Sequence, residues 1–234
     1  MHNPQYSYEY CTYTIRKPTS YKPYYMATEF PSKDIASPLW KLIVSTRAIL
    51  LGLGANLAGP WGAPHATLAR AVRELSASGL VVNRCSSPHA STPVGIGRQP
   101  RYLNAVLAVT ASIAPTVLLR IVKKIERRAG RRLGRHWGPR PLDIDILDHG
   151  GRIIGNPRGR RQPGRLLLPH PEMHRRAFAL LPLQEIAPSW RHPRLGVGAA
   201  TLLARLGPRE RAQVRRTGAR ALDSAAAACD KEYK

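Results

Sequence analysis

The sequence has 234 residues, 43% of them apolar, which is enough for one domain with tails or for two small domains. Its 37 Lys and Arg residues against 14 Asp and Glu residues give a net charge of +23, which favours anionic partners such as nucleotides, nucleic acid or anionic membrane surfaces. No run of about 18 apolar residues occurs in it, which excludes a transmembrane helix. Its three cysteines are widely separated, which excludes a disulfide framework or a cysteine-rich zinc module and indicates reduced thiols in a cytoplasmic protein.

Composition divides the chain into three parts. Residues 1–46 contain most of the tyrosines, lack apolar periodicity and lack a secretory signal, so they are expected to form a disordered N-terminal extension. Residues 47–206 are rich in Ala, Leu, Arg and Gly and are predicted to form the folded domain. Residues 207–234 are expected to form a basic Ala- and Arg-rich tail, with a short helix at most.

Apolar patterns and Gly or Pro breaks predict the elements of the folded domain in chain order. They are a buried strand at 48–54, a helix at 65–78, strands at 81–87 and 103–111 separated by a loop at 88–101, a helix at 115–130, a strand at 142–148, a short strand at 166–169 and a helix at 171–178. This βαββαβ order is typical of an α+β, ferredoxin-like sandwich, in which helices pack on an antiparallel sheet.

The most informative segment runs from Trp137 to Leu147, with the sequence WGPRPLDIDIL. Side chains alternate across a strand, so Asp143 and Asp145 share one face while Ile144 and its apolar neighbours form the other. Paired carboxylates suit a hard cation such as Mg²⁺, which usually binds one or two carboxylates together with substrate phosphates. The alternative is a pair of surface acids on an ordinary amphipathic strand. The scarcity of acidic residues and the neighbouring Arg140 favour the metal site.

Three further patterns carry weaker signals. Residues 120–176 contain sixteen basic and five acidic residues, which fits phosphate binding but also a solvated basic surface. Tyr102 and Asn104 share a strand face and could hold a flat heterocycle, although a rim tyrosine and a turn asparagine would look the same. Residues 52–57 (GLGANL) predict a tight turn after a strand and match neither a P-loop nor GxGxxG.

His170 has no partner at zinc spacing, and no hydrolase triad is recognisable.

Five segments in order resemble the hydroxymethyl-dihydropterin pyrophosphokinases of folate biosynthesis. They are GLGANL, YLNAV, WGPRPLDIDIL, LPHP and PLQEIAP, and they cover roughly residues 47–190. The resemblance implies a ferredoxin-like fold and the transfer of pyrophosphate from Mg²⁺-ATP to the 6-hydroxymethyl group of 6-hydroxymethyl-7,8-dihydropterin, with release of AMP. ATP and a reduced pterin are then the expected small-molecule partners.

The resemblance also implies roles for individual residues. Asp143 and Asp145 would bind two Mg²⁺ ions, and Arg131 and Arg140 would be the catalytic arginines. The residues implied to bind the pterin are Ser91, Pro93, Val94, Tyr102, Asn104, Trp137 and Phe178. Those implied to bind ATP are Glu126, Arg140, Ile146, Arg165, His170 and Arg176.

Several positions depart from the family pattern and put the ATP contacts and the loop dynamics in doubt, but not the metal site or the reaction class. They are Lys123, Leu133, His136, Leu167 and Pro171.

Two other hypotheses are a basic nucleic-acid-binding module and an inactive relative. The first is less favoured because the strand at 103–111 lacks the stacking aromatics of an RNA-binding sheet. A folate-pathway protein partner and the oligomeric state stay open.

Overall fold

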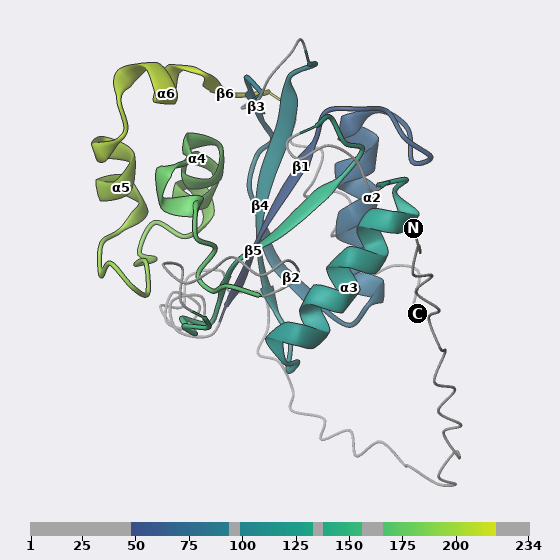
Figure 1. Cartoon of the computed structure of the whole chain (residues 1–234), viewed down its shortest axis with the longest axis horizontal. Coiled ribbons are helices and arrows are strands. Elements are labelled where there is room, and N and C mark those ends of the chain that lie inside the picture. The colour runs from purple at the N-terminus through teal and green to yellow at the C-terminus, as the bar shows by residue number, and fades with distance from the viewer. Residues whose placement is uncertain (1–47, 94–98, 133–137, 156–165, 219–234) are drawn as a thin grey trace, which may run out of the picture. The chain divides into compact units, whose positions relative to one another are not determined.

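The computed structural model describes residues 48–93, 99–132, 138–155 and 166–218, and every element below lies in the unit that spans residues 38–234. Within these ranges, strands form one six-stranded sheet in the order β5-β1-β4-β3-β6, with β2 also paired to β4 (Figure 1). All the pairings are antiparallel. The strands are β1 (Ile49–Ala55), β2 (Val81–Cys85), β3 (His89–Ser91), β4 (Tyr102–Thr110), β5 (Asp143–His149) and β6 (Val214–Arg216).

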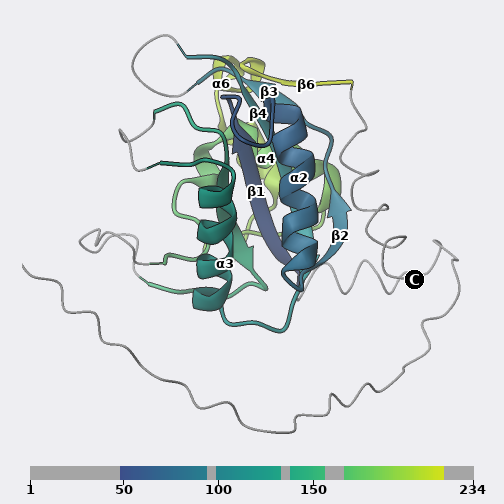
Figure 2. The ribbon, with the colours of Figure 1, turned by 90° about the vertical axis from the view of Figure 1, so that its right-hand side faces the viewer.

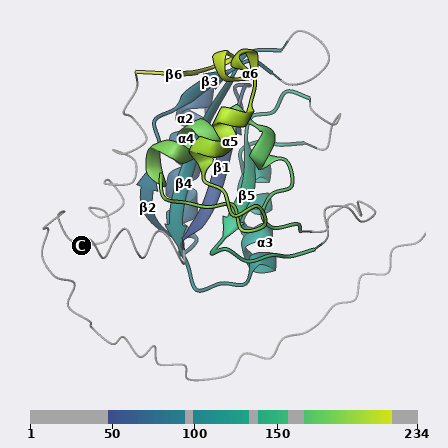
Figure 3. The ribbon, with the colours of Figure 1, turned by 90° about the vertical axis from the view of Figure 1, so that its left-hand side faces the viewer.

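Helices cover both faces of the sheet. Helices α2 (Pro64–Ala77) and α3 (Pro115–Arg128) lie side by side on one face (Figure 2). The other face carries α4 (Ala177–Ile186) and α5 (Ala199–Arg205), which follow the 3₁₀ turn η1 (Met173–Arg175), and the short helix α6 (Pro208–Ala212) comes next in the chain (Figure 3). No helix of the described part of the chain is both long enough and apolar enough to cross a membrane.

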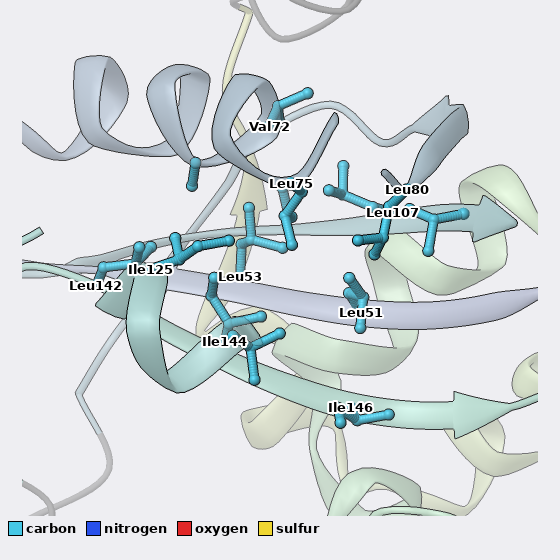
Figure 4. Close-up of a cluster of buried hydrophobic side chains, with 14 of the residues drawn as sticks. Leu51, Leu53, Val72, Leu75, Leu80, Leu107, Ile125, Leu142, Ile144 and Ile146 are labelled. Carbon is cyan, nitrogen blue, oxygen red and sulfur yellow. The ribbon is translucent and has the colours of Figure 1, made fainter. Parts of the chain in front are cut away.

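The two faces have separate apolar cores, because side chains alternate along each strand. Toward α2 and α3, Leu53, Leu107 and Ile144 of the sheet meet Val72 of α2 and Ile125 of α3, as Figure 4 shows. Toward α4 and α5, the sheet contributes a second group that packs on the helices: Leu50, Val106, Ala108 and Leu147. The central strands β1 and β4 are therefore covered on both sides.

Proline and glycine set the ends of the two long helices. Pro64 and Pro115 occupy the first turns of α2 and α3, where the missing N–H costs no helical hydrogen bond. Gly79 and Gly130 follow these helices with φ of 87° and 90°, a conformation in which other residues are strained. The predicted bounds of the first two long helices and of the strands at 48–54, 103–111 and 142–148 agree with the structure to within about two residues.

Later elements differ from the predictions. The predicted loop at 88–101 contains β3, which pairs with both β4 and β6. The predicted helix at 171–178 is wrong: residues 173–175 form η1, and α4 begins only at Ala177 and continues through Pro182 to Ile186. A proline inside a helix removes a hydrogen bond, but the burial of Leu180, Leu183 and Ile186 outweighs that loss. The predicted strand at 166–169 is a single bridge from Leu168 to Ile154.

The sheet also continues beyond residue 206, where the sequence predicted a tail. Helix α6 is the short helix expected there, but β6 was not expected. Its residues pair with β3 from His89↔Arg216 to Ser91↔Val214. In addition, Arg216 donates to Ser87 Oγ at 2.7 Å, which ties this strand to the β2–β3 connection.

Candidate active site

Three neighbouring strands bring the predicted site residues onto one face of the sheet. In the antiparallel register, Gly52 of β1 lies opposite Asp145 of β5, and Gly54 lies opposite Asp143. On its other side, Gly54 lies opposite Asn104 of β4. The two glycines therefore separate the paired carboxylates from Asn104 along one continuous surface.

This surface is the floor of a cleft that η1 and α4 help to line. The cleft is lined by Gly52, Leu53, Gly54, Ser91, Thr92, Tyr102, Asn104, Ala105, Val106, Arg140, Asp143, Asp145, Leu147, His170, Met173, Arg176, Phe178 and Ala179. A Cβ atom on Gly54 would lie 3.5 Å from Asn104 Oδ1 and 3.8 Å from Tyr102 Cδ1. The fold could accommodate such a methyl group, but it would occupy the floor between the carboxylates and the tyrosine. The GLGANL segment thus contributes open floor to the cleft, in addition to the end of a strand.

Two arginines hold Asp143 in its ionised form. Arg140 Nη1 donates to Asp143 Oδ2 at 2.8 Å, and Arg131 Nη1 donates to Oδ1. Burial by itself raises the pKa of Asp143, but the charges of Arg131 and Arg140 outweigh it, so the pKa lies below its ordinary value. Asp143 is therefore an anion at neutral pH.

Asp145 has a different electrostatic environment on the same face. Burial and the neighbouring charge of Asp143 raise the pKa of Asp145. Its nearest cationic candidate is His170, whose Nε2 lies 3.9 Å from Asp145 Oδ2, and burial lowers the pKa of that histidine. Among the described residues, His170 is thus the closest cationic candidate that Asp145 has, and additional positive charge would stabilise this pair of carboxylates.

The donor set of this pair fits Mg²⁺ ligated jointly with phosphates. Both acids offer carboxylate oxygens, the ligands that a hard cation prefers. Within the described ranges, no group of three or more His, Cys, Asp or Glu side chains could hold a metal ion by itself. A cation at Asp143 and Asp145 would therefore take its remaining ligands from substrate oxygens and water.

Glu126 occupies a place that the sequence did not predict. It was predicted to bind ATP, but its side chain is 1% exposed and lies outside the cleft lining. Its Oε1 accepts from Arg131 Nη1 at 2.7 Å, Lys123 Nζ at 2.9 Å and the Ile144 N–H at 2.8 Å. Glu126 thus holds Arg131 beside Asp143 and anchors the backbone between the two aspartates. Burial raises the pKa of Glu126 above its ordinary value.

The side chain of Ile146, a residue predicted to bind ATP, does not line the cleft. It is 4% exposed and packs in the core beneath α2 and α3, on the opposite face from the cleft (Figure 4). The alternation that directs Asp143 and Asp145 into the cleft directs Ile146 away from it. Leu147, two residues after Asp145 and left without a pairing partner in β1 where the register shifts, lines the cleft.

The cleft also contains aromatic and amide groups. Tyr102 and Phe178 both line it, and the guanidinium carbon of Arg176 lies 5.6 Å from the centre of the Phe178 ring. Asn104 Nδ2 donates to His89 O at 3.1 Å and to Ser91 Oγ at 2.9 Å. These bonds use both amide hydrogens and fix the side chain with Oδ1 as the acceptor available for a ligand.

The structure brings most of the predicted site residues together, but not all of them. Those that line the cleft are Ser91, Tyr102, Asn104, Arg140, Asp143, Asp145, His170, Arg176 and Phe178. Pro93 does not line it, whereas Thr92, which was not predicted, does. Predicted residues outside the described part of the chain are Val94, Trp137 and Arg165, as are the departures Leu133 and His136. Asn56 also supports the site, although no sequence pattern pointed to it: its Oδ1 accepts from the backbone N–H of Arg140.

Comparison with known proteins agrees with this geometry. The profile of the family described as 7,8-dihydro-6-hydroxymethylpterin-pyrophosphokinase matches residues 50–188. The 2-amino-4-hydroxy-6-hydroxymethyldihydropteridine pyrophosphokinase of Haemophilus influenzae is 42% identical over 58% of this chain and 79% of its own length. Its namesake in Methylorubrum extorquens is 39% identical over 70% of this chain and 95% of its own length.

Solved structures share the fold. Wild-type HPPK-DHPS of Plasmodium falciparum superimposes with a TM-score of 0.55 and 14% identity over 75% of this chain. This chain spans 45% of that longer protein, so the likeness concerns the fold of one part of it. Taken with the profile match, which covers more than half of the sequence, these similarities show that the chain belongs to the 7,8-dihydro-6-hydroxymethylpterin-pyrophosphokinase family.

Proposed function

We propose that this protein transfers the pyrophosphoryl group of ATP to the 6-hydroxymethyl oxygen of 6-hydroxymethyl-7,8-dihydropterin and releases AMP, a step of folate biosynthesis. The observation that carries the proposal is the bare glycine floor, which joins an acidic, arginine-flanked end of the cleft to an aromatic end with a fixed amide. A phosphate chain and a flat ring need these different surroundings, and the two must lie next to each other for the transfer to occur.

At the aromatic end, the pterin would lie between Tyr102 and Phe178. Asn104 Oδ1 would accept a hydrogen bond from a ring N–H, because Ser91 and His89 already occupy both of its amide hydrogens. A ring held at both faces and at one edge has a defined orientation. Its hydroxymethyl oxygen can then be directed toward the carboxylate end of the floor.

At the acidic end, Asp143 and Asp145 would hold two Mg²⁺ ions together with the ATP phosphates. Bound Mg²⁺ supplies positive charge that neutralises phosphate oxygens. Arg140, Arg176 and His170 line the same region and would pair with the remaining phosphate oxygens. Because pyrophosphoryl transfer needs little covalent help from the protein, positioning and electrostatics suffice. The pterin oxygen forms a bond to the β-phosphorus, the bond from that phosphorus to the α-phosphate oxygen breaks, and the hydroxyl proton passes to solvent.

The finer fold assignment belongs to the same proposal. Chain order β1-α2-β2-β3-β4-α3-β5 and the spatial order β5-β1-β4-β3 support a ferredoxin-like core, in which β2 and β3 together take the place of one edge strand. Helices α4 and α5 would then be additions on the cleft side, and β6 an addition at the edge of the sheet. A cytoplasmic location and a folate-pathway protein partner stay predictions.

The test is product analysis with the full chain, Mg²⁺-ATP and 6-hydroxymethyl-7,8-dihydropterin. AMP should appear in step with the pterin diphosphate, and Asp145→Asn should reduce the rate at least about a hundredfold. Glu210→Gln, on the exposed helix α6, removes the same charge outside the cleft and should keep wild-type turnover. ADP instead of AMP, or no pterin product, would refute the reaction. Full activity in Asp145→Asn would refute the metal-binding role.

A further inference from the structure

Helices α2 and α3 present a strongly basic surface on the side of the sheet that faces away from the cleft (Figure 2). The two helices contain only two acids, and one of them, Glu126, is buried. Glu74 is therefore the single acid of α2 and α3 that can offset their exposed cations. These cations, which we call the basic face, are Arg70, Arg73, Arg120, Lys124, Arg127 and Arg128. None of them lines the cleft.

Helical periodicity and one ion pair bring these cations together. Arg120, Lys124 and Arg127 recur at intervals of three and four residues, on the side of α3 opposite to its buried residues. Arg128 lies toward α2, where its Nη1 donates to Glu74 Oε2 at 2.5 Å. The cations of the two helices therefore form one continuous surface.

A groove between the two helices lies within the basic face. It is lined by Arg70, Arg73, Glu74, Ala77 and Arg128. The guanidinium carbon of Arg70 lies 5.0 Å from the ring centre of Trp61, and its Nε lies 3.5 Å from Glu74 Oε1. Glu74 thus orients two guanidinium groups at the groove, and each of them keeps further N–H groups available.

The other four cations have no partner within the described part of the chain. There, Arg73, Arg120, Lys124 and Arg127 form no hydrogen bond and no ion pair. Exposed cations on rigid helices keep their charge available for an anionic ligand. Because a guanidinium group can pair with two oxygens of one phosphate, a ligand with several phosphates in a row fits this surface.

The composition of the surface favours a nucleic acid duplex over other anionic partners. Protein interfaces have an apolar core, and membrane-surface helices insert apolar side chains. The large exposed apolar side chains of the described residues are Val81, Ile153 and Leu195, none of which belongs to α2 or α3. Single strands are held by aromatic side chains that stack on bases, whereas Trp61 is covered by Arg70. A duplex needs neither feature, because its phosphates lie on the outside, at one charge per about 1.7 Å of the axis.

We propose that the basic face binds the phosphate backbone of double-stranded DNA without reading its sequence, with one backbone strand along the groove between α2 and α3. Duplex RNA also displays 2′-hydroxyl groups, which donate as well as accept. Glu74, the one acid of this surface, is already engaged by Arg70 and Arg128, so DNA is the favoured duplex. The lack of stacking aromatics, which argues against an RNA-binding sheet, does not affect a backbone contact made by helices. Binding here is independent of the proposed function, because the basic face lies outside the cleft.

The experiment titrates a short fluorescent DNA duplex of arbitrary sequence with the full chain. Fluorescence anisotropy gives the dissociation constant at several salt concentrations between about 50 and 200 mM. The test variant combines Arg73→Gln, Lys124→Gln and Arg127→Gln. These side chains are exposed and have no partner within the described ranges, so the variant should keep the wild-type fold.

The matched control combines Arg205→Gln, Arg209→Gln and Arg211→Gln on α5 and α6. It removes the same charge from exposed positions outside both the basic face and the cleft (Figure 3). Each lost phosphate contact lowers the slope of log K against log salt by about 0.9, so we expect the slope of the test variant to be about 2–3 smaller than that of the wild type. Its affinity should fall at least about tenfold, whereas the slope of the control should change by less than about 1. Both variants should keep the wild-type rate of AMP release and the wild-type urea midpoint.

Defined results would overturn the proposal. A control that loses as much slope as the test variant would do so, because the DNA would then respond to net charge alone. Tighter binding of a single strand or of an RNA duplex of the same sequence would also overturn it. So would binding to phosphatidylserine vesicles that the test variant loses while its DNA affinity stays unchanged. Absence of AMP release by the wild type would refute the proposed function alone, because the anisotropy does not depend on turnover.

Discussion

Protonation of His192 should make the fold sensitive to mild acid. This histidine is 3% exposed, its Nδ1 accepts from the Arg194 N–H at 3.2 Å, and its ring meets Trp190 and His174 at centroid distances of 5.8 and 5.7 Å. Burial, reinforced by the charges of His174 and Arg194, lowers the pKa of His192 from 6.5 to about 4. The unfolded chain therefore binds a proton at pH values where the folded protein does not.

The sign and size of the effect follow from this difference. Because the pKa is lowered in the folded state, the stabilisation is complete above pH 6.5 and disappears as the pH falls toward about 4. Between pH 7 and pH 5, this single group should lower the free energy of unfolding by about 2 kcal/mol. His149 and His174 also have lowered pKa values and add to the acid sensitivity, so the contribution of His192 must be measured as a difference between proteins.

The assay is urea unfolding at pH 7 and pH 5 for the wild type and His192→Asn. Asparagine does not titrate, yet its Oδ1 can still accept from the N–H two residues ahead. The variant should be less stable than the wild type at pH 7, because ring packing on Trp190 is lost, but should lose about 2 kcal/mol less on acidification. Equal losses in the two proteins would refute the reasoning.

Three further substitutions test other parts of the site and its support. Gly54→Ala should lower kcat/KM, because the added methyl group occupies the cleft floor, with little change in the unfolding midpoint. The control is Gly198→Ala, in which the added methyl group has a similar 3.5 Å contact outside the cleft and activity should be kept. Equal activities of the two variants would contradict the role of the floor. Glu126→Gln should cost about 1–3 kcal/mol in urea unfolding and lower kcat, because one buried oxygen accepts from three donors; unchanged values would refute it. Asp148→Asn should also lower the free energy of unfolding by about 1–3 kcal/mol. Asp148 accepts from Trp190 Nε1 at 2.8 Å and from the Gly151 N–H at 2.9 Å, and the single amide oxygen of asparagine cannot replace both acceptors. An unchanged unfolding midpoint would contradict this.

The sequence was most informative where one strand determines the geometry. Alternation along β5 and β4 was sufficient to predict that Asp143 and Asp145 share a face, as do Tyr102 and Asn104. The same rule places the side chain of Ile146 in the core, and the structure confirms this.

Features that depend on several segments could not be predicted. The floor arises because Gly54 pairs with Asp143 on one side and Asn104 on the other, and strand register does not follow from local composition. The position of Glu126 depends on how α3 packs on β5. Strands β3 and β6 have three residues each, which is too short for a recognisable period, so their pairing was missed.

Strand β6, the last strand in chain order, limits how far the protein can be shortened. The profile match ends at residue 188, but β6 covers the outer edge of β3, whose Ser91 orients Asn104. A fragment that ended at residue 188 would expose unpaired backbone N–H and C=O groups of β3 beside Asn104 and the cleft. An open edge of that kind is a template for association with other chains. Residues beyond the profile match therefore cover a sheet edge beside the cleft and protect it against such association.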